Sequence, residues 1–417
     1  MYIWSMKRII PGDFFEIVSR AGYRLSPNGF FHSKKERSHD LVPDERGKSR
    51  RKEAQTTRDI LSKQLLVLAA MAVCIGAGAQ DRLAMLVGTY TEGGSSKGVY
   101  LYSFYQETAR EELLDTAWAG NPSFVAFSAD GRFAYSVSEY ADGRAGAVSY
   151  RLGPGTVDRM NGQPLGEGCG DPCNLLITGG HLLTANYTGG SLSFLPVAPD
   201  GTLLPSGRTF TPSKPSHMHC ALLSPDGEYI FATDLGGDRI FRLSARLPET
   251  AEAAAVYAGK KGLGPRHMVF SPDGRFAYLI NELGDALTVF RYRGGTLKKI
   301  QQLEAYSGKG HGSADIHLTP DGRFLYTSHR LEGDGIALFQ VDRKTGKVKK
   351  AGFQPTGKHP RNFTVTPNGK YLLCACRDSG CIEIYAIDPA DGRLADTGRR
   401  IELPKPVCIA LQRPGAT

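Results

Sequence analysis

Arginine, histidine and glutamate residues recur at a fixed distance from a repeated turn glycine. The turn glycines are Gly131, Gly180, Gly227, Gly274, Gly322 and Gly369. Eight residues before five of them lie Ser123, His219, Arg266, Ala314 and Arg361, and eight residues after them lie Glu139, Leu235, Glu282, Arg330 and Arg377. Antiparallel strands joined at such a turn bring the two sets together, which predicts Arg266 beside Glu282, Arg361 beside Arg377, and Ser123 beside Glu139.

These positions carry four arginines against two glutamates. A guanidinium group without a carboxylate partner suits bidentate contact with a carboxylate or phosphate, so the pattern predicts an anion-binding mouth. Further polar residues lie next to these positions in register: His217, His267, Asn281, Asp234, Asp315, His317, His359 and Asn362. The alternative is structural: Arg266 and Glu282 would merely tie two strands together, and the histidines would be satisfied hydrogen-bonding groups in a channel.

The strands that carry these residues belong to a repeat of about 48 residues. Its phrase is an apolar strand, a turn of the form (S/T)-P-D-G, and a second apolar strand, as in GPRHMVFSPDGRFAY and HPRNFTVTPNGKYLL. Successive turn glycines are 49, 47, 47, 48 and 47 residues apart. This period and turn chemistry predict an all-β protein, a seven-bladed β-propeller with four-stranded blades.

Six copies of the repeat are complete, and the seventh is divided between the two ends of the chain. The run VCIAL at residues 407–411 resembles an innermost strand, whereas LAMLVGTY, GVYLYSFY and LLDTAWA near residues 83–119 supply the other three. Closing the ring in this way covers the open sheet edges. We therefore expect the propeller to occupy residues 81–417.

The segment before the propeller has the composition of a leader. The net charge is +9, and much of the excess lies before residue 70 in SKKERSHD and RGKSRRKE, so no nucleic-acid partner is expected. The run LLVLAAMAVCIGAGA at residues 65–79 ends in an A-x-A site, which predicts a signal peptide at about 61–79 and no stable membrane span after its cleavage. Residues 1–60 are expected to be a basic leader, either disordered or not native if translation starts near Leu61. A periplasmic or secreted location follows; the alternatives are a cytoplasmic protein, or an uncleaved anchor behind the leader.

Seven cysteines lie in the expected propeller: Cys169, Cys173, Cys220, Cys374, Cys376, Cys381 and Cys408. Their spacings do not match the paired C-x2-C sets of zinc sites, and an odd number leaves at least one unpaired. They are therefore expected to be small buried hydrophobic residues. The same region has no C-x-x-C-H sequence, which disfavours a haem-containing redox propeller.

The motifs GPRHMVFSPDGRFAYLINE, HPRNFTVTPNGKYLL, VGTYT, ANYTGGS and the S-H-x-H before LLSPDG resemble the propeller-type 6-phosphogluconolactonases and the related fungal carboxymuconate-lactonising enzymes. The resemblance covers residues 84–411. It implies a sugar-lactone hydrolase without metal or other cofactor, with chemistry at the mouth by Arg266, Glu282, Arg330 and either His217 or His219. The count from the turn glycine favours His219. Asn174 departs from the family, which usually has an aromatic residue or histidine after the Pro-Cys pair.

The expected mechanism uses His219 or Glu282 as general base, and Arg266 and Arg330 to stabilise the oxyanion or hold an acid group. His217, His267, Asn281, Arg361, Arg377 and Glu139 are the expected substrate-binding residues, with Arg361 and Arg377 on a remote phosphate or carboxylate. The substrate is expected to be a small sugar lactone with an anionic group, bound by a monomer or homodimer. The alternative function is a non-catalytic exported propeller that binds a carbohydrate or a protein.

Overall fold

The computed structural model describes residues 81–205, 207–246, 253–308 and 311–412, together with two short paired strands, β1 (Tyr23–Leu25) and β2 (Phe31–Ser33). The chain divides into two compact units, Met1–Cys74 and Ile75–Thr417. The predicted signal peptide lies outside the described residues, and so does the basic leader apart from these two strands. The second unit carries the repeat.

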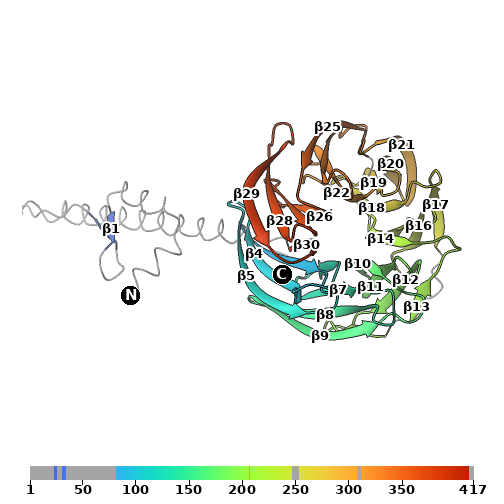
Figure 1. The fold of residues 1–417 in the computed structure, drawn as a ribbon, viewed down its shortest axis with the longest axis horizontal. Coiled ribbons are helices and arrows are strands. Elements are labelled where there is room, and N and C mark those ends of the chain that lie inside the picture. The colour runs from blue at the N-terminus through green and yellow to red at the C-terminus, as the bar shows by residue number, and fades with distance from the viewer. Residues whose placement is uncertain are drawn as a thin grey trace, which may run out of the picture. The chain divides into compact units, whose positions relative to one another are not determined.

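Seven antiparallel four-stranded sheets form the second unit, arranged as the blades of a ring (Figure 1), which confirms the predicted seven-bladed β-propeller. The strands nearest the axis are β6 (Val125–Phe127), β10 (Pro172–Thr178), β14 (Met218–Leu223), β18 (Pro265–Phe270), β22 (Ser313–Leu318), β26 (Pro360–Val365) and β30 (Pro406–Gln412). Their partners are β7 (Phe133–Ser138), β11 (His181–Asn186), β15 (Tyr229–Asp234), β19 (Phe276–Asn281), β23 (Phe324–His329), β27 (Tyr371–Cys376) and β3 (Arg82–Thr89).

The two outer layers of the blades complete each sheet. The third strands are β8 (Gly146–Gly153), β12 (Ser191–Pro196), β16 (Arg239–Ser244), β20 (Ala286–Arg293), β24 (Gly335–Val341), β28 (Cys381–Ile387) and β4 (Gly98–Tyr105). The outermost strands are β9 (Thr156–Pro164), β13 (Arg208–Phe210), β17 (Ala254–Ala258), β21 (Thr296–Glu304), β25 (Val348–Pro355), β29 (Leu394–Glu402) and β5 (Arg110–Trp118). All six residues of β19 are buried, because blades cover both of its faces, whereas outermost β21 is largely exposed or half-buried.

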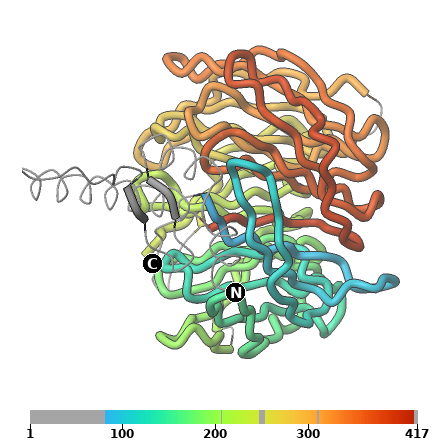
Figure 2. Tube along the Cα trace, turned by 90° about the vertical axis from the view of Figure 1, so that its left-hand side faces the viewer, coloured from blue at the N-terminus to red at the C-terminus, as the bar shows by residue number. Residues whose placement is uncertain are grey.

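The ring closes as the sequence predicts, through a blade made from both ends of the propeller. C-terminal β30 pairs with β3, and the sheet continues through β4 to β5. The pairing joins Leu86 to Ala410 and Val87 to Ile409, and in Figures 1 and 2 the red C-terminal segment lies beside the blue N-terminal strands. This pairing leaves β30 no free edge on that side.

The S-P-D-G turn is built by its own side chains. In the turn between β18 and β19, Ser271 Oγ donates to Asp273 Oδ1 at 2.6 Å and accepts the N–H of Phe276 at 3.0 Å. Gly274 has a φ of +69°, a left-handed conformation that favours glycine. The turn therefore fixes the register of the two strands on which the site residues lie.

A β-bulge interrupts the innermost strand of six blades near its start. In β18 the pairing slips between Pro265 and His267, and equivalent slips occur in β10, β14, β22, β26 and β30. The extra residue is His219 in β14, Arg266 in β18 and Arg361 in β26. Because a bulge redirects a side chain, this irregularity accounts for the aim of these three residues.

Side chains of the innermost strands also bond one blade to the next. The amide oxygen of Asn174 accepts the N–H of Ala221 at 3.0 Å, and that of Asn362 accepts the N–H of Ile409 at 2.7 Å. Equivalent bonds join Asp315 to the N–H of Phe363, and Cys408 Sγ to the N–H of Val125, and the His267 side chain meets that of Asp315. These bonds form an inter-blade belt at five of the seven blade junctions. Asn174, the departure from the family pattern, takes part in this belt. The seven cysteines of the propeller are buried, as predicted, and all seven are free.

Loss of a belt bond should destabilise the ring. Asn362→Leu leaves the buried N–H of Ile409 without a partner and also removes a donor to Asp315, so we expect a loss of about 1–3 kcal/mol in the free energy of unfolding. Asn174→Leu removes one bond and should cost less. Urea denaturation of both variants measures the difference, and equal stability of Asn362→Leu and wild type would contradict the belt.

Candidate active site

The Glu282 carboxylate lies at the mouth of the ring between two buried arginines. Its Oε2 accepts Arg266 Nε at 2.7 Å, and its Oε1 accepts Arg330 Nη2 at 2.8 Å. Arg266 also donates to the carbonyl of Ala314, and Arg330 Nε donates to the carbonyl of Gly312 at 3.0 Å. Both arginines are buried, whereas 20% of the Glu282 side chain is exposed. The predicted contact between Arg266 and Glu282 is therefore present, and Arg330 joins it from the next blade.

A second ion pair crosses the closing blade. Arg361 Nη2 lies 3.3 Å from Glu139 Oε2, and the Tyr90 hydroxyl donates to Glu139 Oε1 at 2.8 Å. The guanidinium of Arg361 also stands over the Tyr90 ring, 5.4 Å from its centroid. The two ion-pair groups together hold three arginines and two glutamates. The mouth therefore carries one net positive charge, which suits a monoanion.

Histidines from the β14 blade border the Glu282 carboxylate. His219 Nε2 lies 4.0 Å from Glu282 Oε2, and the His219 side chain is 5% exposed. The Tyr187 ring stacks on His217 at 4.5 Å and meets His219 edge-on at 5.7 Å. His217 Nδ1 also bonds the carbonyl of Tyr187 at 2.8 Å. Of the two candidate histidines, His219 lies next to the Glu282 carboxylate, whereas His217 contacts the Tyr187 ring that also meets His219.

Burial and charge set the protonation of these groups. The arginines outweigh burial and lower the pKa of Glu282, so it is ionised at neutral pH. Burial first, and Arg266 next, lower the pKa of His219 well below its usual range, which keeps the imidazole neutral. Burial raises the pKa of Tyr187, so its phenol stays protonated. The mouth therefore offers an anionic carboxylate, a neutral imidazole and a phenol proton.

Further inside the ring, Asp315 organises a second polar group. Its Oδ1 lies 2.8 Å from His267 Nδ1, its Oδ2 lies 3.1 Å from His317 Nε2, and Asn362 donates to Oδ2. These residues line a cavity of about 270 Å3 that is also walled by Phe124. His267, predicted as a substrate contact, therefore lies in the channel.

Two predicted binding residues make their hydrogen bonds outside the ion pairs of the mouth. Arg377 is not paired with Arg361; its Nε donates to Asp378 Oδ1 at 2.6 Å, so its role with substrate stays a prediction. The Asn281 side chain is fully buried and donates to the carbonyl of Ala286 and to Thr288 within its own blade. Its Oδ1 has no hydrogen-bond partner among the described residues, and its role with substrate stays a prediction. Ser123, expected beside Glu139, has a buried hydroxyl without a partner among the described residues.

Two tyrosines and one cysteine at the mouth were not predicted as site residues from the sequence. Tyr90 and Tyr187 belong to VGTYT and ANYTGGS, motifs that carried the resemblance without being assigned as site residues. Cys173 occupies the bulge of β10, equivalent to Arg266, and lies close enough to Glu139 and Arg361 to feel their charges. Burial raises the pKa of the Cys173 thiol, which disfavours a thiolate nucleophile.

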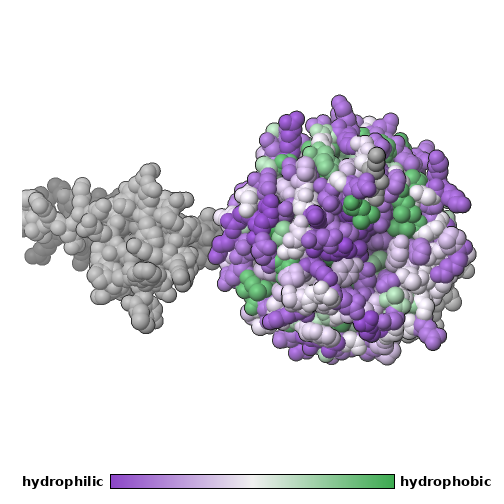
Figure 3. Space-filling view, in the orientation of Figure 1, coloured by the Kyte–Doolittle hydropathy of each residue, from purple (hydrophilic) through white to green (hydrophobic). Residues whose placement is uncertain are grey.

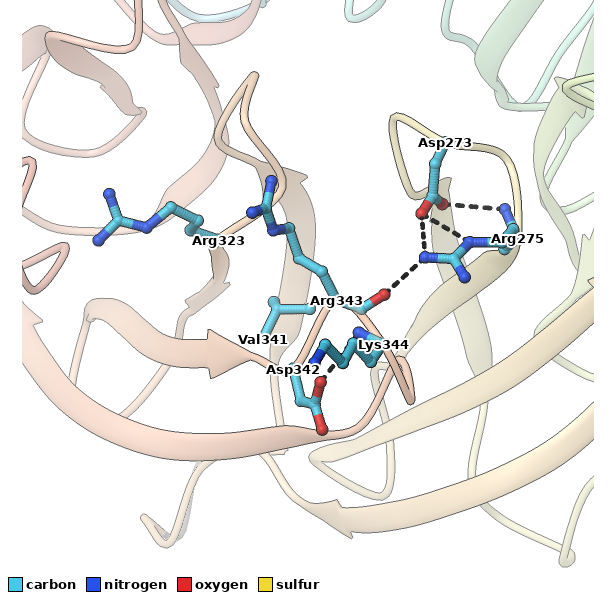
Figure 4. A pocket seen from close by; sticks show the side chains of 7 residues that line it. All are labelled: Asp273, Arg275, Arg323, Val341, Asp342, Arg343 and Lys344. Atoms are coloured by element: carbon cyan, nitrogen blue, oxygen red, sulfur yellow. Dashed lines mark hydrogen bonds and ion pairs between the residues drawn. The ribbon is translucent and has the colours of Figure 1, made fainter.

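A second hollow of the described surface is rich in arginine but has no histidine or glutamate in its lining. The surface in Figure 3 is largely hydrophilic, with small separate hydrophobic patches. A hollow of about 580 Å3 lies among the turns, where Arg275, Arg323, Arg343 and Lys344 gather (Figure 4). Its charged side chains are exposed, and Arg275 forms a local ion pair with Asp273 at 2.7 Å. Among the described residues no group of three or more His, Cys, Asp or Glu side chains could hold a metal ion.

The sequence matches a family model described as lactonase, 7-bladed beta-propeller, over residues 84–411. The chain belongs to this lactonase family. The 6-phosphogluconolactonase of Formosa agariphila is 33% identical over 333 residues, which cover 74% of this chain and 94% of that protein. A solved structure from Bacteroides uniformis is 45% identical, with a TM-score of 0.77, and covers 80% of this chain and 100% of that one. The periplasmic gluconolactonase of Pseudomonas aeruginosa is 32% identical, with a TM-score of 0.73, and covers 80% of this chain and 99% of that one.

These relatives confirm the enzyme class that the motifs predicted, a lactonase acting on a sugar lactone. In the lactonase, the part of the chain that the structure describes contains no helix long and apolar enough to cross a membrane.

Acid should destabilise this lactonase through its buried histidines. Burial first, and Arg266 next, lower the pKa of His267 from 6.5 to about 4, so below pH 6.5 the unfolded chain binds a proton that the folded chain does not. His267 alone should remove about 3 kcal/mol of unfolding free energy between pH 6.5 and 4. Urea denaturation across this range should show a shallower pH dependence for His267→Gln. If the unfolding free energies of variant and wild type fell equally with pH, His267 would not be the source of the pH dependence.

Proposed function

We propose that this lactonase opens a gluconolactone-type sugar lactone at the mouth, with Glu282 and His219 at the reacting carbonyl. The observation that carries the proposal is the Glu282 carboxylate, fixed by Arg266 and Arg330 and 4.0 Å from a buried neutral imidazole. A fixed carboxylate and imidazole at this separation can hold a water molecule between them. Water held there is positioned to attack a carbonyl carbon.

Hydrolysis consumes one water molecule and breaks the bond from the carbonyl carbon to the ring oxygen. The water oxygen bonds to the lactone carbonyl carbon while its proton passes to His219 or Glu282, and the carbonyl oxygen becomes an oxyanion. The bond from that carbon to the ring oxygen then breaks, and the ring oxygen takes a proton to become a hydroxyl. The carboxylic acid so formed then gives up the second proton of the water, so the products are a hydroxy-carboxylate and one released proton. The base that took the water proton can donate it to the ring oxygen. Tyr187, a protonated phenol stacked on His217, is the other candidate donor.

The arginines divide into a positioning pair and an anion site. Arg266 donates from Nε to Glu282 and from Nη1 to the carbonyl of Ala314, so its main role is to orient the carboxylate. Arg330 Nη1 makes no hydrogen bond within the described part of the chain, so it can donate to the oxyanion. Arg361 shares its charge with Glu139 through contacts of 3.3 and 3.5 Å. These contacts are longer than those of Glu282, which leaves Arg361 available to an anionic group on the substrate.

The anionic group can be a phosphate on the sugar or the carboxylate formed by the reaction. One relative is named 6-phosphogluconolactonase, and another is named periplasmic gluconolactonase. Export through the predicted signal peptide would favour a substrate without phosphate. Export stays a prediction, because residues 61–79 lie outside the described part of the chain.

Loss of the base should abolish most turnover. Glu282→Gln and His219→Gln should each lower kcat by roughly 10²–10⁴-fold, the usual contribution of general acid–base catalysis. Steady-state hydrolysis of gluconolactone measures the effect, with circular dichroism to confirm folding, because Glu282→Gln leaves two buried arginines uncompensated. Glu112→Gln, an exposed change of the same type on outermost β5, is the matched control. Wild-type kcat in both site variants would refute the assignment.

A substrate comparison tests the anion site. Gluconolactone with and without a 6-phosphate should be compared on wild type and on Arg361→Gln. If Arg361 binds the phosphate, the variant should raise KM for the phosphorylated lactone by about tenfold or more, since a charge-assisted bond is lost, with a smaller change for the other. Equal changes in KM for the two lactones would instead assign Arg361 to a group that they share. A wild-type enzyme inactive on both would overturn the proposed substrate class.

A further inference from the structure

A line of imidazole and carboxylate groups extends from Glu282 along the inside of the ring. His219 Nε2 is 4.0 Å from Glu282, and the His219 ring meets the His267 ring edge-on, with centroids 5.2 Å apart. His267 Nδ1 lies 2.8 Å from Asp315 Oδ1, and Asp315 Oδ2 lies 3.1 Å from His317 Nε2. Three blades supply these five residues, so the line is a property of the ring and not of one hairpin.

Two nitrogens in this line are buried without a hydrogen-bond partner among the described residues, His219 Nδ1 and His267 Nε2. Buried polar atoms are nearly always bonded, and a water with polar neighbours on each side commonly completes such a gap. An imidazole can accept a proton on one nitrogen and release one from the other. The two rings therefore have the free atoms needed to pass a proton from the mouth into the channel.

The far end of the line reaches solvent. The side chain of His317 is 35% exposed, compared with 11% for His267 and 5% for His219. His317 lines an open pocket of about 360 Å3 together with Leu318 and Thr319, the residues that lead into the turn after β22. The turns lie at the opposite ends of the strands from Glu282 and Arg330. The line therefore joins the enclosed mouth to the opposite face.

The proposed reaction supplies a reason for such a path. Hydrolysis of a lactone to a carboxylate releases one proton per turnover, and a bound substrate covers the mouth. Three arginines make the mouth an unfavourable place for that proton to stay. We infer that His267, Asp315 and His317 form a proton relay that carries the released proton from His219 to solvent on the turn-bearing face. This inference rests on the proposed function.

The test separates a relay from a structural role, because Asp315 also belongs to the inter-blade belt. His317→Gln and His267→Gln keep polar side chains but cannot pass a proton in this way. In weak buffer each should lower kcat by about tenfold with KM unchanged, since proton transfer becomes limiting. Added imidazole should restore kcat of His317→Gln, because the small base can enter the open pocket and take the proton from Asp315 or His267.

The matched control is His311→Gln. His311 Nδ1 lies 3.1 Å from Asp285, whose side chain is 5% exposed, so this variant also removes an imidazole from a buried aspartate, but outside the line. It should keep wild-type kcat at every imidazole concentration. Unchanged kcat of His317→Gln and His267→Gln in weak buffer, or a loss in His317→Gln that imidazole does not restore, would overturn the relay. Either result leaves lactone hydrolysis by the wild type standing. A wild type that hydrolyses no lactone would overturn the proposed function and the relay together.

Discussion

The convergence of seven innermost strands on one axis is the constraint on which this structure depends. Backbone N–H groups of these strands are buried at the blade junctions, where no ladder partner is available, and each must find an acceptor. Asn174, Asp315, Asn362 and Cys408 provide acceptors from the neighbouring blade. The same side chains that close the junctions therefore set the spacing between blades. That spacing determines which residues can meet across the mouth.

The site follows from a bulge placed just beyond this belt. Each bulge adds one extra residue to an innermost strand, and three of these residues are His219, Arg266 and Arg361. The ends of the adjoining strands contribute Glu282 and Arg330 at the same level. Several like charges in one small space would repel, so each carboxylate is shared with arginines and the remaining charge is a single positive one. This arrangement keeps the mouth folded while leaving it attractive to an anion.

The periodicity was sufficient to predict the fold and part of the site. Turn glycines at constant spacing fixed the strand register, and register alone places Arg266 beside Glu282. Register could not predict that Arg361 reaches Glu139, because this contact spans the closing blade and depends on ring geometry. It also could not give the hydrogen-bond partners of a side chain at a strand end: Asn281 donates to Ala286 and Thr288 of its own blade. Tyr90 and Tyr187 lay in motifs already noticed, but their role depends on contacts between blades.

The most direct measurement of the central claim is a crystal structure of Glu282→Gln with a sugar lactone bound. The account predicts the lactone in the mouth, with its carbonyl carbon facing His219 and residue 282, its carbonyl oxygen near Arg330, and any phosphate on Arg361. A lactone bound instead in the arginine-rich hollow beside Arg275 and Arg343, or in the mouth with its carbonyl turned away from His219, would contradict the account.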